Sequence, residues 1–315
     1  MHNNIKKVTC VGSGLIGQGW ATLFLARGYA VTLQDLSPDL LKIATEKVAL
    51  NLKFMENNGL LQKGKATPAG KHIRTTTELT EAVRGADYIQ ESVFDNYPVK
   101  KEVFKSLDAR VPADTIIASS SSGLLMSEIQ TVVTHPERCV LTHPFLPVHL
   151  IPLVEIVGGG QTSPETVQIA NDLMLKLGKV PVRLKKEVSG YIVNRLQAAI
   201  LREAMDLVVT GVASAEEVDT AFCTGMGMRD PFIGPLLRAH LAGDGIENFL
   251  ENYSDSYRVR WESMATWKSV SPAIREDLVE KVKAMPVVRQ NSLDQIKNWR
   301  DRMLVEVLKL DRSCC

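Results

Sequence analysis

The chain contains 315 residues, of which 45% are hydrophobic and 23% are charged. That size and composition can supply a large core and indicate more than one domain. The formal net charge of +1 gives no sign of nucleic-acid binding or of attraction to an anionic membrane. No apolar run reaches the roughly 18 residues that a membrane span needs. We therefore expect a globular protein that binds neither nucleic acid nor membrane.

The cysteines and the start of the chain favour a cytoplasmic location. Five cysteines are scattered along the sequence, at positions 10, 139, 223, 314 and 315. They form no CxxC pair and no Cys/His spacing typical of zinc sites, so no metal is expected. The first residues lead directly into an apolar run, which leaves no room for a signal peptide. Cysteines without a disulfide framework fit a reducing compartment.

The first elements form a recognisable motif. A strand is expected over residues 5–11, followed by Gly12-Ser13-Gly14-Leu15-Ile16-Gly17 and a helix that extends to about Arg27. A second strand is expected over residues 30–34, and Asp35 ends it. This order and spacing are typical of the βαβ unit that begins a dinucleotide-binding domain. A glycine-rich turn in another α/β protein is the alternative.

The residue types of this motif suit a dinucleotide. Gly12 allows the tight turn, Gly14 lets the backbone approach a pyrophosphate, and Gly17 lets helix and strand pack closely. The helix N-terminus offers free N–H groups and the positive end of its dipole. The Asp35 carboxylate can accept both ribose hydroxyls and repels a 2′-phosphate, so NAD is favoured over NADP. The expected cofactor contacts are Gly12, Gly14, Leu15, Ile16, Gly17 and Asp35.

Strands and helices alternate through the following part of the chain. A helical insertion over residues 38–70 contains two patterns, at 38–58 and 60–70. Further strands are expected over 72–75, 87–91, 115–118, 139–142, 153–157 and 180–184, with helices over 78–84, 97–109 and 164–177. This alternation predicts a Rossmann-type, doubly wound, mostly parallel sheet of the α/β class.

The character of the sequence changes near residue 186. Helices are expected over 189–210, 214–224, 245–253, 274–284 and 293–310, without a convincing strand, and residues 287–292 are expected to form a loop. We therefore predict two domains, a dinucleotide-binding Rossmann domain over residues 1–187 and an all-helical domain over residues 188–315.

Two residues near strand ends could transfer protons. His143 lies at the carboxyl end of the strand over 139–142, where ligands bind in open α/β sheets. Glu155 interrupts the apolar run LVEIV, and a buried acid is costly unless it is paired. A paired His and Glu could donate or remove a hydroxyl proton beside a nicotinamide. Alternatively, Glu155 faces solvent from an edge strand and His143 is a satisfied loop residue.

Three other polar sites each have two interpretations. The serine run 119–122 follows a strand and enters a helix near residue 124, so Ser122 could contact a ligand, or Ser122 or Ser127 could cap that helix. Asn194 lies on an apolar helix face and is either an interdomain hydrogen bonder or a substrate ligand. Arg229, in TGMGMRDPF, can bind a carboxylate with two hydrogen bonds; alternatively it is a surface arginine, or a partner for Asp230.

Several motifs together resemble one family. VGSGLIGQGWA, IQESV, SSSSGLL, the spacing of His143 and Glu155, and SGYIVNRLQAAI occur in this order and resemble the 3-hydroxyacyl-CoA dehydrogenase family over essentially the whole chain. Within that family, TGMGMRDPFIGP, HPFLPVHLIPLVEIV, KKEVSGYIVNRLQ and NWRDRMLVEVLKL look most like the λ-crystallin / L-gulonate 3-dehydrogenase branch. The L-carnitine dehydrogenases are similar too.

The resemblance implies an NAD-dependent dehydrogenase of a small-molecule substrate. His143 would be the general acid/base, Glu155 would orient it, and Ser122 and Asn194 would hydrogen-bond the reacting oxygen of the substrate. The family also implies a homodimer through the helical domain. Three polar residues would line the cofactor cleft: Glu91, Asp95 and Lys100.

Two departures from the family bear on the substrate. Relatives carry Asn where this chain has Leu146, so a polar contact near the substrate is lost. The acyl-CoA enzymes lack an arginine in the glycine-rich link where this chain has Arg229. The expected reaction is therefore oxidation of the 3-hydroxyl of a small, L-gulonate-like hydroxy-carboxylate to a 3-keto acid.

Three alternatives remain open from the sequence. The insertion over 38–70 could cover a CoA moiety with Lys53, Lys63 and Lys65, as in an L-3-hydroxyacyl-CoA dehydrogenase. An L-carnitine 3-dehydrogenase would need an aromatic site for a quaternary ammonium. The candidates for that site are Tyr253, Tyr257, Trp261 and Trp267. The third alternative is an NAD-binding, crystallin-like structural protein without catalysis.

Overall fold

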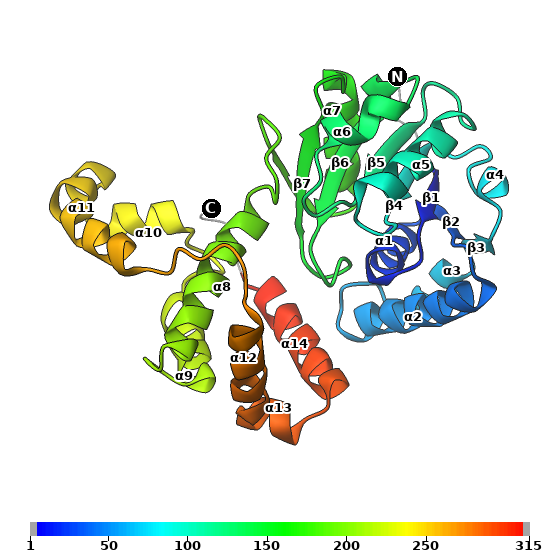
Figure 1. The fold of residues 1–315 in the computed structure, drawn as a ribbon. Coiled ribbons are helices and arrows are strands. Elements are labelled where there is room, and N and C mark those ends of the chain that lie inside the picture. The colour runs from blue at the N-terminus through cyan, green and yellow to red at the C-terminus, as the bar shows by residue number, and fades with distance from the viewer. Residues whose placement is uncertain (1–4, 311–315) are drawn as a thin grey trace. The chain divides into compact units, whose positions relative to one another are not determined.

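The computed structural model describes residues 5–310 (Figure 1). Cys314 and Cys315 therefore lie outside the described residues. The described chain divides into two compact units between Asn194 and Arg195. The functional division after residue 187 stays a prediction.

The first unit contains a sheet and its covering helices. Its strands are β1 (Lys7–Val11), β2 (Ala30–Gln34), β3 (Ile73–Thr76), β4 (Tyr88–Glu91), β5 (Ile116–Ser119), β6 (Cys139–Pro144), β7 (Leu153–Gly158) and β8 (Val180–Arg183). Its α-helices are α1 (Leu15–Ala26), α2 (Pro38–Asn57), α3 (Ala66–Gly70), α4 (Leu79–Ala82), α5 (Tyr97–Asp108), α6 (Met126–Ile129) and α7 (Pro164–Lys176).

The eight strands form one sheet in the order β3-β2-β1-β4-β5-β6-β7-β8. All neighbouring strands are parallel except β6 and β7, which are antiparallel. The expectation of a doubly wound, mostly parallel sheet is therefore confirmed. The reversal follows from chain length, because a parallel return needs a crossover of about a dozen residues or more, whereas only residues 145–152 connect these strands.

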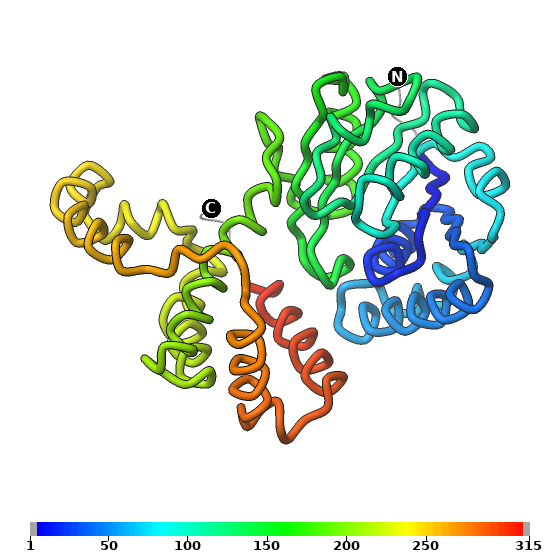
Figure 2. The backbone as a smooth tube through the Cα atoms, in the orientation of Figure 1, coloured from blue at the N-terminus to red at the C-terminus, as the bar shows by residue number. Residues whose placement is uncertain are grey.

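Helices cover both faces of the sheet and enclose two apolar cores. On one face, α1, α2 and α7 pack against the sheet around Trp20, Phe24, Leu52 and Leu173. On the other face, α5 and α6 pack around residues such as Phe104. The helical insertion over residues 38–70 is the crossover between parallel strands β2 and β3, as the blue part of the trace shows (Figure 2).

The second unit is helical, apart from its turns. The long helix α8 (Val193–Val209) runs into it, and α9 (Ala215–Ala221), α10 (Pro235–Ala242), α11 (Ile246–Ser263), α12 (Pro272–Ala284), α13 (Pro286–Gln290) and α14 (Leu293–Leu308) follow. A π-helical stretch, Phe222–Met226, extends α9.

One expectation about this unit was wrong, and one helix was missed. The loop expected over residues 287–292 is mostly the short helix α13, which Pro286 opens with its fixed φ. The sequence also gave no sign of α10, whose Gly234 N-cap and Pro235 start lie in a glycine- and proline-rich link. None of the helices within residues 5–310 is long and apolar enough to span a membrane.

Candidate functional site

The carboxyl ends of β1, β2, β4, β5 and β6 carry most of the residues singled out in the sequence. The parallel strands end side by side, so the loops that follow them gather at one edge of the sheet. This edge is where ligands bind in open α/β sheets.

The glycine-rich loop after β1 has no room for side chains at two positions. Gly12 has φ +93°, and a Cβ there would lie 2.7 Å from the carbonyl oxygen of Ser92. A Cβ at Gly17 would lie 1.9 Å from the carbonyl oxygen of Gly12. Glycine is therefore required at both positions, for the left-handed turn at Gly12 and for the close approach of helix and loop at Gly17.

The third glycine faces open space. A Cβ at Gly14 would meet no atom within 4 Å, and Gly14 is the N-cap of α1 without a side-chain cap. The first N–H groups of α1 are thus available to an anion, as they are where a pyrophosphate binds. The next residue, Leu15, is 70% exposed beside this opening. The loop fits a dinucleotide on these grounds.

Asp35 lies beside the same loop. Its Oδ2 accepts hydrogen bonds from the backbone N and the hydroxyl of Ser13, each at 2.7 Å. Its Oδ1 accepts from the N–H of Leu36 at 2.7 Å. A carboxylate keeps further lone pairs beyond these bonds, so Asp35 can still accept ribose hydroxyls.

Glu91 and Lys100 form a buried ion pair at the end of β4. The Lys100 ammonium donates to the two Glu91 oxygens at 2.8 and 3.0 Å, and both side chains are at most 1% exposed. The Ser119 hydroxyl and the N–H of Val93 also donate to Glu91. The buried pair therefore packs against the serine run and is bonded to it through Ser119. Its contact with a cofactor stays a prediction.

Asp95 holds the end of the serine run. Its carboxylate accepts from the Ser121 hydroxyl at 2.6 Å, the Ser122 hydroxyl at 2.7 Å and the Ser122 N–H at 3.0 Å. Burial raises the pKa of Asp95, but these hydrogen bonds and the charge of Lys100 outweigh it and keep the pKa below its usual value. Because Ser122 donates its proton to Asp95, its lone pairs remain to accept a bond from a ligand.

The capping interpretation of the serine run was wrong. The helix after it, α6, begins at Met126 and has Leu125 as its N-cap, so neither Ser122 nor Ser127 caps it. Asn194 instead joins the run, since its Nδ2 donates to the carbonyl oxygen of Ser122 at 2.9 Å. Ser122 and Asn194 are therefore neighbours, and their contact with a substrate stays a prediction.

His143 and Glu155 lie directly opposite each other on the antiparallel strands β6 and β7. The His143 Nδ1 and Glu155 Oε2 are 2.8 Å apart, and the residues are 4% and 1% exposed. The other carboxylate oxygen accepts from the N–H groups of Ile192 and Val193 at 2.9 and 3.0 Å. The interpretation of Glu155 as a solvent-facing edge residue was therefore wrong, because β8 covers β7.

The charge of Glu155 is stabilised in this position. Burial raises the pKa of Glu155, but the hydrogen bonds from His143, Val193 and Ile192 outweigh it and lower the pKa. An ionised Glu155 accepts a hydrogen bond from the Nδ1–H group of His143. The neutral imidazole then carries no proton on Nε2, whose lone pair is available as a base. Among the described residues 5–310, Nε2 has no hydrogen-bond partner.

Sequence reasoning missed Tyr191, which joins the two halves of the site. The ring of Tyr191 lies 5.2 Å from that of His143, and its hydroxyl donates to the carbonyl oxygen of Leu124, beyond the serine run, at 2.6 Å. Its φ of +48° is rare for a bulky residue and turns the next N–H groups toward Glu155. Phe145, also missed, packs edge-on against His143 at 4.5 Å. For Tyr191, the sequence offers one indication of this role, an aromatic residue directly after Gly190.

Arg229 and Leu146 are the two other residues that bear on the substrate. Arg229 lies in the second unit, is exposed, and forms no side-chain ion pair within residues 5–310. The pairing with Asp230 was wrong, because Asp230 pairs with Arg238 at 2.8 Å. Leu146 lies in the connection between β6 and β7 and is 49% exposed.

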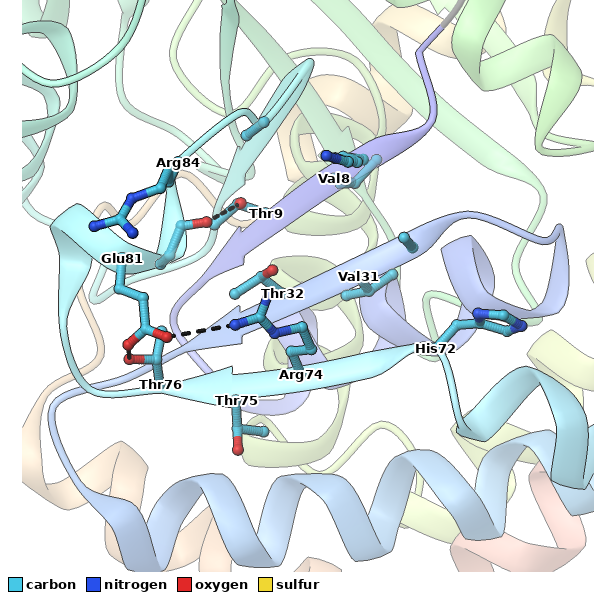
Figure 3. A pocket seen from close by; sticks show the side chains of 14 residues that line it. Val8, Thr9, Val31, Thr32, His72, Arg74, Thr75, Thr76, Glu81 and Arg84 are labelled. Carbon is cyan, nitrogen blue, oxygen red and sulfur yellow. Dashed lines mark hydrogen bonds and ion pairs between the residues drawn. The ribbon is translucent and has the colours of Figure 1, made fainter.

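A separate cavity of about 220 Å³ lies on the face of β1, β2 and β3 (Figure 3). Its charged lining includes Arg74 and Glu81, which lie 3.5 Å apart, and the Thr76 hydroxyl donates to Glu81. None of the expected site residues lines it. Within the described chain, no group of three His, Cys, Asp or Glu residues could hold a metal ion.

Comparisons with known proteins agree with this geometry. Residues 7–188 match the NAD binding domain of 3-hydroxyacyl-CoA dehydrogenase, and residues 190–281 match the C-terminal domain of the same family. Lambda-crystallin of Oryctolagus cuniculus is 37% identical over 311 residues, which cover 97% of this chain and 96% of the relative. L-carnitine dehydrogenase of a Pseudomonas species is also 37% identical and covers 97% of this chain and 94% of its own length.

A solved structure shares the fold over nearly the full length. It is an NAD-dependent 5-formyl-3-hydroxy-2-methylpyridine 4-carboxylic acid 5-dehydrogenase, with a TM-score of 0.83, 29% identity, and coverage of 97% of this chain and 98% of its own. The family matches extend over parts of both units. The glycine-rich loop, Asp35 and the pair of His143 and Glu155 all lie within residues 7–188, which match the NAD binding domain. The chain therefore belongs to the 3-hydroxyacyl-CoA dehydrogenase family of NAD-dependent oxidoreductases.

Proposed function

We propose that this enzyme oxidises the 3-hydroxyl of a small, L-gulonate-like hydroxy-carboxylate to a 3-keto acid. The observation that supports it is the pair of His143 and Glu155, with Glu155 anchored by two backbone N–H groups. When bound, NAD supplies the acceptor for the hydride that leaves the substrate carbon. The residues that would hold it are those of the glycine-rich loop and Asp35.

The protein's own residues account for the proton. The Nε2 lone pair of His143 takes the proton of the substrate hydroxyl, and the Glu155 carboxylate stabilises the imidazolium that forms. Ser122, whose proton points to Asp95, accepts a hydrogen bond from a second hydroxyl of the substrate and so holds the reacting hydroxyl near His143. Asn194 keeps the serine run in place through the Ser122 carbonyl. In reduction, the imidazolium returns the proton to the carbonyl oxygen.

We propose that Arg229 recognises the substrate carboxylate. Its guanidinium is exposed and free of ion pairs within the described chain, and its fork geometry suits a carboxylate. The related dehydrogenase of a pyridine carboxylic acid also acts on a carboxylate by its name. Arg229→Gln should raise the KM for the acid and leave kcat much less affected. Arg238→Gln, which removes the partner of Asp230, is the matched control and should leave KM unchanged.

A substrate panel tests the proposal. L-Gulonate, L-carnitine, 3-hydroxybutyrate and 3-hydroxybutyryl-CoA are each supplied with NAD, and NADH is followed by its absorbance. The proposal predicts the highest kcat/KM for L-gulonate or a similar small acid. Preference for the thioester would favour an L-3-hydroxyacyl-CoA dehydrogenase. NADH binding without turnover of any compound would favour a crystallin-like structural protein.

L-Carnitine is the second candidate, because several curated relatives at 37% identity are L-carnitine dehydrogenases. Three of the expected aromatic residues, Tyr253, Tyr257 and Trp261, form a ladder along α11 with ring spacings of 5.2 to 5.6 Å through Phe249. The guanidinium of Arg260 already covers the Tyr257 ring at 4.7 Å. That contact makes this ladder a poor site for a second cation.

We also propose a cytoplasmic homodimer formed through the helical unit. A cavity of about 480 Å³ in this unit is almost entirely apolar, and its lining includes Ile200, Leu207, Val218 and Phe222. Apolar surface of this kind is typical of contacts between subunits. Ile200→Asp should convert the dimer to a monomer in sedimentation experiments. Val212→Asp, at a residue that is 69% exposed and outside this cavity, should leave the dimer intact.

A further inference from the structure

Lys179 is a buried lysine that has no carboxylate partner among residues 5–310. It lies in the turn between α7 and β8 and is 5% exposed. Its ammonium donates to the carbonyl oxygens of Val148 and of Ile151, the latter at 2.6 Å, and it lies 5.6 Å from the centre of the Trp20 ring. Burial lowers the pKa of Lys179 to about 7. A buried cation is expensive, so these contacts have to offset its desolvation.

The two carbonyls belong to the segment that connects the two members of the acid/base pair. Residues 145–152 leave His143 on β6 and return to Glu155 on β7. Phe145, at the start of this segment, packs against the His143 ring at 4.5 Å. This segment contains no helix or strand of its own, and two turn bonds to the Pro147 carbonyl supply its internal backbone pairing. Lys179 therefore attaches the middle of the segment to the α7–β8 turn, in addition to the bond from the Val180 N–H to the Pro152 carbonyl oxygen at 2.8 Å.

The same lysine is attached to the cofactor-binding helix. Trp20 lies on α1, three residues after Gly17, and its Nε1 donates to the Ser120 hydroxyl at 3.0 Å. Val148 packs closely against α1. A Cβ added at Gly19 would lie 2.6 Å from the Cβ of Val148. The contacts of Lys179 thus connect α1, the serine run and the connecting segment.

We propose that Lys179 is a positioning residue that holds the connecting segment 145–152 against α1 and so sets the orientation of His143 toward the hydroxyl that it deprotonates. The catalytic part of this inference rests on the proposed function. Loss of the ammonium frees the carbonyls of Val148 and Ile151, the segment relaxes, and Phe145 no longer fixes the imidazole ring. An error of about 1 Å in such a group can lower turnover by up to about a hundredfold.

The test compares Lys179→Met, Lys179→Gln and a control, Arg27→Gln. Arg27 donates to the Leu177 carbonyl at 2.9 Å and so fastens α1 to the same α7–β8 turn without contacting the segment. Proton NMR of the downfield Nδ1–H resonance of His143, assigned with His143→Gln, reports the geometry without any turnover. We expect Lys179→Met to shift or broaden this resonance and to lower kcat about tenfold or more, with NAD affinity retained. Lys179→Gln, which can donate to one carbonyl, should lie between Met and wild type.

Several outcomes would overturn the proposal. An unchanged His143 resonance in Lys179→Met would show that the segment does not depend on Lys179. A changed resonance with unaltered kcat would show that the orientation does not matter for the reaction. Equal effects in Arg27→Gln, or failure of both Lys179 variants to fold, would assign the lysine to general stability. If no substrate were found, the NMR arm would still test the structural link, so the two proposals fail separately.

Discussion

Replacement of Glu155 by Gln is the sharpest test of the His–Glu pair. The amide keeps the shape of the side chain, and its oxygen can still accept from the N–H groups of Ile192 and Val193, now 2.9 and 3.0 Å away. Its nitrogen then faces His143 Nδ1, which must accept a hydrogen bond where it had donated one. The proton moves to Nε2, so the base loses the lone pair that receives the substrate proton.

The cost follows from what the substitution removes. Loss of general acid/base catalysis lowers turnover by about 10² to 10⁴, which is about 3 to 5 kcal/mol in the barrier at roughly 1.4 kcal/mol per tenfold change. The assay is NADH formation at saturating substrate, with NAD affinity measured separately and expected to stay the same. Glu187→Gln is the control, because Glu187 also accepts a backbone N–H and a hydroxyl, both from Ser127. Turnover of Glu155→Gln close to wild type would refute the assigned role.

Three further predictions concern cofactor binding and stability. Gly17→Ala should abolish NAD binding in calorimetry, because its Cβ would lie 1.9 Å from the Gly12 carbonyl oxygen; retained affinity would show that the loop can yield. Arg138→Met should lower the free energy of unfolding by about 3 to 5 kcal/mol in urea, because it leaves Asp108 buried without its 2.5 Å ion-pair partner; a loss below 1 kcal/mol would indicate an exposed pair. The unfolded chain keeps the pKa of Lys179 near 10.5 and the folded chain lowers it to about 7, so the unfolded state binds more protons between these values. Unfolding free energy should therefore rise by about 1 to 2 kcal/mol from pH 7 to pH 8.5, and a Lys179→Met variant with the same slope would contradict this.

Local patterns were sufficient to predict much of this molecule. The order of strand, glycine-rich loop, helix, strand and Asp35 depends on contacts close in sequence, and the structure has the expected turn at Gly12. The pairing of Glu155 could also be anticipated, since an acid in an apolar strand needs a partner. The structure supplies His143 in direct register with it.

Other features depend on contacts that no local pattern reveals. The reversal of β7 follows from the short connection 145–152, because the apolar patterns of β6 and β7 are the same for parallel and antiparallel pairing. Lys100 lies near the start of an amphipathic helix, where the sequence pattern suggests a solvated lysine. In the structure it is buried and forms an ion pair with Glu91. Tyr191, at its positive φ, contacts His143 and Leu124, and the next two N–H groups bind Glu155, all of them far away in the sequence.

The helical unit was harder to predict for a different reason. The two helices that were missed are short and begin with residues common in loops, Gly234 before α10 and Pro286 at the start of α13. The sequence pattern therefore favoured irregular structure where the chain forms helices. Helix α11 extends to Ser263, well past the expected end, although residues 254–263 present no buried apolar face that could have predicted it.

The most direct test of the central claim is transfer of deuterium from C3 of the accepted hydroxy acid. The acid labelled at C3 is incubated with NAD and the enzyme, and the reduced cofactor is analysed by mass spectrometry. We predict that the label appears in the reduced cofactor with wild-type enzyme and with the Glu187→Gln control, and that His143→Gln forms labelled cofactor far more slowly. Reduced cofactor without the label, or labelled cofactor formed equally fast by His143→Gln, would contradict hydride transfer assisted by the His143–Glu155 pair.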